Sequence, residues 1–161
     1  MGEECILFKE KINYKYPGGG QFLAHMDQPA YPEISKSIAC AICIDDSNAN
    51  SGCLELAKGV HKQNIAITDK GVIDDNIHAD LIYEKCEMNS GDLLIFDGFT
   101  PHKSGNNETD KSRRIIYTTY NPISDGDLRD LYYINKKKKL KHGLISYQDD
   151  FTGNVVETTG N

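Results

Sequence analysis

Short stretches of alternating apolar and polar residues dominate the first three quarters of the chain. Alternation with a period of two gives a strand one set of side chains on each face, so these stretches predict β-strands. Turn-forming runs such as 17-PGGG-20 and 89-NSGD-92 separate them. The predicted strands cover residues 5–16, 21–27, 36–45, 53–59, 81–87, 92–97 and 113–121. This layout predicts a mostly antiparallel, mostly β fold.

One segment near the C-terminus has the features of a helix. Residues 124–141 start at the N-cap candidates Ser124 and Asp125, carry acidic residues in the first turn and end in 136-KKKKLK-141, as the helix dipole favours. Such a lysine run is more often a solvated helix end than a phosphate site. Residues 142–161 give no clear signal, and we expect part of them to be disordered.

Length and composition indicate a single globular domain. The 161 residues are 39% hydrophobic and 26% charged, which suffices for one core, and no linker or internal repeat divides them. We therefore expect one domain over residues 1–161. Its core would span about residues 9–121, and a helix and tail would occupy residues 122–161.

Charge and apolar content exclude several classes of partner. The formal net charge of −6 disfavours nucleic acid, which binds basic surfaces. No apolar run approaches the roughly 18 residues that span a bilayer, and the N-terminus lacks a signal-peptide core. We expect a cytoplasmic protein that binds neither nucleic acid nor membranes. Its five scattered cysteines predict reduced thiols rather than a zinc site.

The segment 22-FLAHMDQPAY-31 has a histidine two residues before an aspartate at the end of a predicted strand. Residues i and i+2 of a strand share a face, so His25 and Asp27 would project together. Among the other histidines, only His102 follows a strong predicted strand. Two histidines and one carboxylate on facing strands make the facial triad of non-haem Fe(II) oxygenases, which leaves metal positions open for a cosubstrate and dioxygen.

An arginine pair eleven residues beyond His102 fits the same chemistry. Many such oxygenases use 2-oxoglutarate, whose distal carboxylate suits a bidentate arginine. Arg113 and Arg114 open the next predicted strand, and adjacent strand residues face opposite ways, so only one of them would point inward. The alternative for Arg113 is a surface ion pair with Glu108 or Asp110.

Four motifs in order resemble the phytanoyl-CoA dioxygenase family of Fe(II)- and 2-oxoglutarate-dependent oxygenases. They are 25-HMD-27, 52-GCLELAKGVHK-62, 91-GDLLIFDGFTPH-102 and 102-HKSGNNETDKSRR-114. The resemblance runs from about Lys9 to Tyr120. It implies a double-stranded β-helix, or jelly roll, with the metal inside the open end of the barrel and one helix near the C-terminus.

The resemblance also implies roles for individual residues. His25, Asp27 and His102 match the family's iron ligands. Arg113 matches the residue that pairs with the distal carboxylate of 2-oxoglutarate, and Ser104 matches a hydroxyl near the same group.

Some positions are alternatives to the family pattern or depart from it. If the match to the family is shifted by one residue, Arg114 takes the place of Arg113 as the residue that pairs with 2-oxoglutarate. Asn107 matches an asparagine of the family, for which we expect a structural role. Ser51, Lys58 and Val60 stand where relatives usually have asparagine, proline and serine, and the chain has no tryptophan. The loop that carries these three replacements would therefore shape a different substrate pocket.

These roles imply an enzyme that hydroxylates a small organic substrate and converts 2-oxoglutarate and dioxygen to succinate and CO2. Residues 119–140 resemble tails of relatives that hydroxylate aminoalkyl phosphonates, for which Lys15, Arg129 or a tail lysine would supply positive charge. Small polar substrates such as amino-acid derivatives fit equally well. Because Asp27 occupies a ligand position that a halide would need, hydroxylation is favoured over halogenation.

Two other classes stay open from the sequence alone. One is a non-catalytic or 2-oxoglutarate-independent jelly roll that binds a metal, and the other is a cupin-type enzyme that uses a metal without 2-oxoglutarate. Arg113 discriminates between them and the oxygenase, because only the oxygenase needs it. The sequence does not set an oligomeric state.

Overall fold

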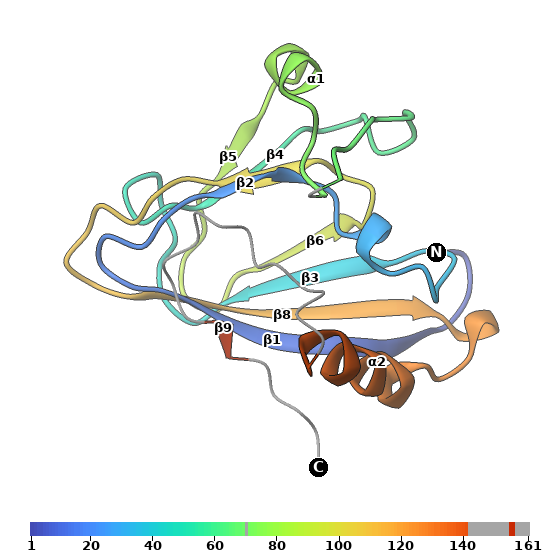
Figure 1. Cartoon of the computed structure of the whole chain (residues 1–161). Helices are drawn as coiled ribbons and strands as arrows, with labels where there is room; N and C mark the ends of the chain where they lie inside the picture. The colour runs from blue at the N-terminus through green and yellow to red at the C-terminus, as the bar shows by residue number, and fades with distance from the viewer. Residues whose placement is uncertain (70, 142–154, 157–161) are drawn as a thin grey trace.

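Two antiparallel sheets face each other in the computed structural model, which describes residues 1–69, 71–141 and 155–156 (Figure 1). The larger sheet has the strand order β6-β3-β8-β1-β9 and the smaller one the order β2-β7-β4-β5. The strands are β1 (Cys5–Lys15), β2 (Phe22–His25), β3 (Ile38–Cys43), β4 (Leu54–Leu56), β5 (Glu84–Cys86), β6 (Leu93–Asp97), β7 (His102–Ser104), β8 (Arg113–Pro122) and β9 (Val155–Val156). The predicted mostly antiparallel jelly-roll fold is confirmed.

The seven predicted strands all form, most of them shorter than predicted. β4, for example, ends at Leu56, where the prediction ran to residue 59. The sequence reading missed β7, because three residues are too few to show an alternation. This short strand nevertheless pairs with both β2 and β4 and joins the halves of the smaller sheet.

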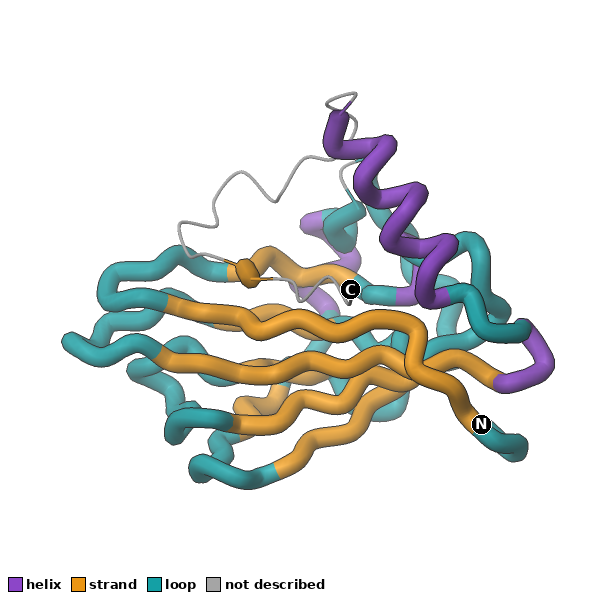
Figure 2. Tube along the Cα trace, turned by 90° about the horizontal axis from the view of Figure 1, so that it is seen from below, coloured by secondary structure: helices purple, strands orange, loops and turns teal. Residues whose placement is uncertain are grey.

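The C-terminal helix starts later than the predicted Ser124 or Asp125. Residues Ile123–Asp125 form a separate 3-10 turn, η2, and α2 covers Arg129–Lys141. Gly126 ends the turn with φ of 89°, and the Asp125 carboxylate accepts hydrogen bonds from the backbone N–H and hydroxyl of Ser35 at 2.8 and 2.9 Å. These hydrogen bonds to a distant segment hold Asp125 in the 3-10 turn, so the α-helix starts only at Arg129. α2 then packs along the side of β1 (Figure 2), where the Tyr133 hydroxyl donates to the backbone carbonyl of Glu10.

Two further short helical elements lie in loops. α1 (Asp75–Asp80) is capped by Asp74, whose side chain accepts from the N–H of Asn76 at 3.0 Å, and η1 covers Gln28–Ala30. The sequence reading missed α1, because six residues contain too few turns for a helical apolar period. No helix in the described part of the chain is long and apolar enough to cross a bilayer.

The main core lies between the two sheets. It consists of the buried side chains Ala39, Ala41, Cys43, Leu54, Leu56, Phe96 and Ile115. Cys43 points into this core while Cys40 is half-buried on the other face of β3, as the spacing of three predicts. All five cysteines are free thiols.

Inward-facing side chains of β1 and β8 turn polar toward one end of the sandwich. The strands pair antiparallel, with a bulge between Leu7 and Lys9, and alternate residues beyond the bulge face the smaller sheet. The inward pairs are Lys11 with Tyr117, Asn13 with Ile115, and Lys15 with Arg113. Polar groups on an inner face require partners, so this end of the fold is where a ligand site belongs.

Candidate metal centre and adjoining cavity

Three of the predicted site residues converge between the sheets. His25 ends β2, His102 begins β7, and the two residues are direct partners across that strand pair. Asp27 follows two positions after His25, and its Oδ1 lies 3.9 Å from Nε2 of His25. The candidate ligand atoms of all three residues lie within 4.8 Å of one another. Within the described residues, this is the one such group of histidine, cysteine or acidic side chains.

Backbone carbonyls fix the tautomer of both imidazoles. Nδ1 of His25 lies 2.7 Å from the carbonyl oxygen of Leu23, and Nδ1 of His102 lies 3.0 Å from that of Thr100. A carbonyl oxygen only accepts, so each Nδ1 carries the proton and each neutral ring keeps its lone pair on Nε2. Both histidines are therefore oriented and protonated as metal ligands require.

Local electrostatics keep the histidine neutral and the aspartate ionised. Burial, helped by the nearby His102, lowers the pKa of His25 to about 3, although Asp27 opposes the shift. Burial alone would raise the pKa of Asp27, but His102 in its protonated form and the Lys9 ammonium outweigh burial and hold that pKa well below its ordinary value. Two neutral nitrogens and one carboxylate form a donor set that suits a divalent transition metal.

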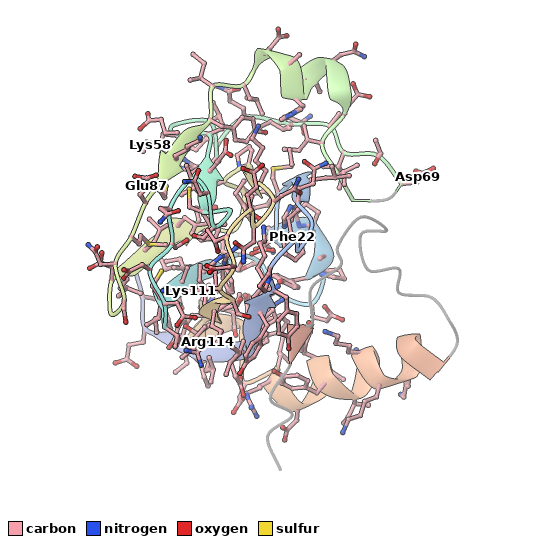
Figure 3. The ribbon with its side chains drawn as sticks, turned by 90° about the vertical axis from the view of Figure 1, so that its left-hand side faces the viewer. Phe22, Lys58, Asp69, Glu87, Lys111 and Arg114 are labelled. Carbon is pink, nitrogen blue, oxygen red and sulfur yellow. The ribbon has the colours of Figure 1, made fainter. Side chains whose placement is uncertain are left out.

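A cavity adjoins these three residues, with walls from both sheets. Figure 3 views the sandwich from this side and shows Phe22 between the sheets, with Arg114 on the larger sheet below it. The walls are formed by Lys11, Asn13, Phe22, His25, Asp27, Leu54, His102, Lys103, Ser104, Arg113 and Tyr117. The predicted residues His25, Asp27, His102, Ser104 and Arg113 thus share one cavity.

Arg113 presents an unused donor in this cavity. Its side chain is buried, only 2% exposed, and donates through Nη2 to the carbonyl of Gly52 at 2.8 Å and through Nε to that of Ser51 at 3.4 Å. Nη1 is buried and has no hydrogen-bond partner within the described chain. A buried, unpaired guanidinium N–H is costly, so this position suits an anion. The alternative of a surface ion pair for Arg113 is wrong.

The backbone carbonyls of Ser51 and Gly52, which accept hydrogen bonds from Arg113, are positioned by a turn that requires glycine at residue 52. Gly52 has φ of 69°, and a Cβ at this position would lie 2.4 Å from the carbonyl oxygen of Gly105. Only glycine permits both the left-handed backbone and this close approach. The conspicuous Gly-Cys-Leu motif of the sequence therefore supports the cavity wall rather than contributing a ligand.

Arg114 faces away from the cavity. Its backbone N–H and Nε both donate to Oδ2 of Asp45 at 2.8 Å, and Nη2 donates to Oδ1 at 2.7 Å. This bidentate pair raises the pKa of Arg114 further and holds the side chain on the outer face. Strand alternation thus gives Arg113 to the cavity and Arg114 to the surface.

Lys15 lies behind the cavity wall instead of in it. The side chain is fully buried, and its ammonium donates to the Ser104 hydroxyl at 2.8 Å and to the carbonyl of Gly105. Burial, with Arg113 nearby, lowers the pKa of Lys15 to about 7. Because this ammonium already has its partners, Lys15 fixes the position of Ser104 and is not placed to meet a substrate.

The remaining predicted residues have structural positions. Arg129 pairs with Glu10 on the outer face of β1, away from the cavity. Asn107 is fully buried and donates to the carbonyls of Lys15 and Lys111 at 2.9 and 2.8 Å, which agrees with its expected structural role. The predicted disorder in residues 142–161 falls outside the described residues, except for β9.

The sequence reading missed several residues of the cavity wall. Lys11 and Asn13 were detectable, because they share the inner face of β1 with Lys15 at the i, i+2 spacing. Asn13 is 4% exposed, and its Oδ1 has no partner among the described residues. Tyr117 lies opposite Lys11 and carries no sequence signal of its own, because aromatic residues are common in strands.

Comparison with known proteins identifies a family and several relatives of this chain. A model of the phytanoyl-CoA dioxygenase family matches residues 4–115. A methylphosphonate hydroxylase of Gimesia maris is 45% identical over 141 residues, which cover 87% of this chain and 54% of the relative. A 2-aminoethylphosphonate dioxygenase of an uncultured bacterium is 38% identical over 143 residues, covering 87% of this chain and 55% of the relative. The chain spans about half the length of these curated relatives.

Solved structures share the fold at lower identity. EctD from S. alaskensis in its apo form superposes with a TM-score of 0.68 at 22% identity, covering 77% of this chain and 47% of that chain. The same enzyme with 2-oxoglutarate and 5-hydroxyectoine gives a TM-score of 0.69 at 20% identity, covering 77% and 46%. At this identity the likeness shows a common jelly-roll fold.

Proposed function

The chain belongs to the phytanoyl-CoA dioxygenase family, and from that premise we propose that it is an Fe(II)- and 2-oxoglutarate-dependent dioxygenase that hydroxylates a small organic phosphonate. The reaction would use dioxygen and release succinate and CO2. The observation that carries the proposal is the unpaired Nη1 of Arg113 in the same cavity as His25, Asp27 and His102. A metal site alone would not need a buried arginine beside it.

The residues present fit the metal and the cosubstrate. His25, Asp27 and His102 would hold Fe(II), since two imidazole nitrogens and a carboxylate occupy one face and leave the other open. Arg113 would bind the distal carboxylate of 2-oxoglutarate by a charge-assisted pair. Ser104 accepts from Lys15, so its own proton is available to the same carboxylate.

The protein contributes binding, orientation and the exclusion of water. When bound, Fe(II) and 2-oxoglutarate supply the oxidising power that inserts one oxygen atom of O2 into a substrate C–H bond. Arg113 and Ser104 set the orientation of the cosubstrate, while Phe22 and Leu54 give the cavity apolar walls that limit water. Asp27 fills the ligand position that a halide would require, which favours hydroxylation over halogenation.

The proposed substrate class draws on the relatives. The two curated relatives are named for methylphosphonate and for 2-aminoethylphosphonate, and the phosphonate group is common to both names. We also propose that residues 1–161 act as one unit, because the cavity combines residues of both sheets. A cytoplasmic location without nucleic-acid or membrane partners stays a prediction.

Matched arginine variants test the proposal. Turnover of 2-oxoglutarate to succinate is measured with Fe(II) for the wild type, Arg113→Met and Arg114→Met. We expect Arg113→Met to raise the KM for 2-oxoglutarate on the order of 10-fold to 100-fold, as loss of a charge-assisted bond implies. Arg114→Met, which loses only the outer pair with Asp45, should change it less than about 3-fold. Equal effects of the two variants would contradict the proposed role of Arg113.

A further inference from the structure

Two positive side chains line the cavity at different levels of the same strand pair. Arg113 is opposite Lys15, whereas Lys11 is opposite Tyr117, with the pair Asn13 and Ile115 between them. At a rise of about 3.4 Å per residue, the backbone positions of Lys11 and Lys15 are roughly 14 Å apart along β1. The cavity therefore offers one cation near the proposed cosubstrate site and another toward its other end.

No carboxylate in the described part of the chain forms an ion pair with Lys11. Its ammonium lies 5.4 Å from the ring centroid of Tyr117, and it forms no ion pair or hydrogen bond with any described residue. A ring face leaves the N–H donors of the ammonium available to a ligand. The positive charge of Lys11 also acts on the proposed metal-ligand group, which consists of His25, Asp27 and His102. It helps to lower the pKa values of both His25 and Asp27.

The second lysine of the cavity wall is in a different situation. Nζ of Lys103 lies 3.7 Å from a carboxylate oxygen of Glu55 and 4.5 Å from the ring centroid of Tyr83. Its charge is already offset by an acid, so binding an anion there would require breaking an existing pair. Lys11 is thus the cation best able to receive an anionic substrate group.

We infer that Lys11 and Tyr117 bind the phosphonate group of the substrate, and that the cavity selects alkyl phosphonates without an amino group. This inference rests on the proposed function. The Lys11 ammonium would supply charge and donors. The Tyr117 hydroxyl, which also interacts with the Arg113 guanidinium, would supply another donor between the two cations. Burial raises the pKa of Tyr117 to about 12, so the hydroxyl keeps its proton at neutral pH.

The selectivity follows from how few acidic side chains the described cavity wall contains. Asp27 is the one carboxylate among the described lining residues, and it belongs to the metal-ligand group. Among these described residues, the ammonium group of an aminoalkyl phosphonate would therefore find no carboxylate of its own and would lose hydration without compensation. A short uncharged alkyl group would instead meet the apolar side chains of Phe22 and Leu54.

Binding measurements on the full chain test the inference. Methylphosphonate and 2-aminoethylphosphonate are titrated anaerobically into protein loaded with Fe(II) and 2-oxoglutarate, and the Kd of each is measured by calorimetry. We expect Lys11→Met to weaken methylphosphonate binding by about 10-fold or more and Lys11→Arg to retain it within about 3-fold. Lys103→Met should lose less than about 3-fold, because Glu55 already offsets its charge. In the wild type, methylphosphonate should bind more tightly than 2-aminoethylphosphonate.

The possible results separate this inference from the proposed function. The affinity for 2-oxoglutarate, measured in the same variants, should not change in Lys11→Met. Wild-type affinity for methylphosphonate in Lys11→Met, or an equal loss in Lys103→Met, would overturn the role of Lys11. Equal or tighter binding of 2-aminoethylphosphonate would overturn the selectivity. A wild type that binds 2-oxoglutarate but neither phosphonate overturns the whole inference, whereas failure to bind 2-oxoglutarate overturns the proposed function itself.

Discussion

His25 and His102 face each other across the pair of β2 and β7, with ring centroids 4.2 Å apart, and each gives its Nδ1 proton to a carbonyl two residues earlier in the chain. The same local hydrogen bond thus orients both rings. Because the backbone supplies the acceptors, the two Nε2 atoms are directed without help from other side chains. In the proposed metal-ligand group of His25, Asp27 and His102, the two histidines are therefore positioned by the strands before any metal binds.

A preformed group predicts that a divalent metal stabilises the folded protein. At a metal concentration 100 times Kd, the free energy of unfolding should rise by about 2.7 kcal/mol, because the unfolded chain lacks the arranged ligands. Thermal unfolding with and without Mn(II) measures this gain. His102→Ala should abolish the increase in Tm, and His78→Ala, at a histidine whose Nδ1 is 3.2 Å from the Tyr83 hydroxyl, should keep it. An undiminished increase in His102→Ala would contradict the assigned ligands.

The buried lysine behind the cavity predicts a pH dependence of stability. Lys15 loses its proton near pH 7 in the folded protein but only near 10.5 when unfolded. Between these values unfolding takes up a proton, so the free energy of unfolding rises with pH, by at most about 1.4 kcal/mol per pH unit for this group. Urea unfolding at pH 7, 8 and 9 should show this rise in the wild type and a smaller one in Lys15→Met. Parallel pH profiles for the two proteins would be evidence against the lowered pKa.

Two glycines with similar backbone angles should respond differently to alanine. Gly52 and Gly59 have φ of 69° and 79°, so both substitutions strain the backbone by about 1 kcal/mol. A Cβ at Gly52 would also collide with the carbonyl oxygen of Gly105, whereas a Cβ at Gly59 meets nothing within 4 Å. We expect Gly52→Ala to cost about 3 kcal/mol or more and Gly59→Ala about 1 kcal/mol in urea unfolding. Similar costs would show that the close approach is not maintained in solution.

The outer ion pair should contribute little to stability. Arg114 and Asp45 form a bidentate pair, but their side chains are 43% and 27% exposed. Water and salt screen such a pair, so in a double-mutant cycle Arg114→Met and Asp45→Asn should lower the free energy of unfolding almost additively. Strongly non-additive effects in urea unfolding would mean that the pair is more shielded than its exposure indicates.

Local sequence patterns predicted the His25 and Asp27 half of the proposed metal-ligand group, because only that half is local in the sequence. The i, i+2 spacing puts His25 and Asp27 on one side, and alternation allows only one of Arg113 and Arg114 to face inward. Which of the two does so depends on Asp45, which lies 69 positions away and holds Arg114 outside. A sequence pattern alone could not decide this.

The roles of the lysines on β1 could not be predicted for a similar reason. Lys11 and Lys15 have the same parity and share a face of the strand. Lys15 is sealed off by Ser104 and Gly105, which are about 90 positions away in the chain, whereas Lys11 stays open to the cavity. The late start of α2 has the same origin, since Ser35 holds Asp125 over a separation of 90 residues. Contacts between distant segments thus determine which lysine faces the cavity and where the helix starts, and the periodicity of the sequence does not reveal these contacts.

Use of 2-oxoglutarate at the proposed iron site is best tested by anaerobic titration of the Fe(II)-loaded protein with 2-oxoglutarate, followed by visible absorption. We expect the weak charge-transfer band of an iron-bound keto acid in the wild type and its loss in His102→Ala. If iron binds without producing this band, the chain is a metal-binding jelly roll that does not use 2-oxoglutarate.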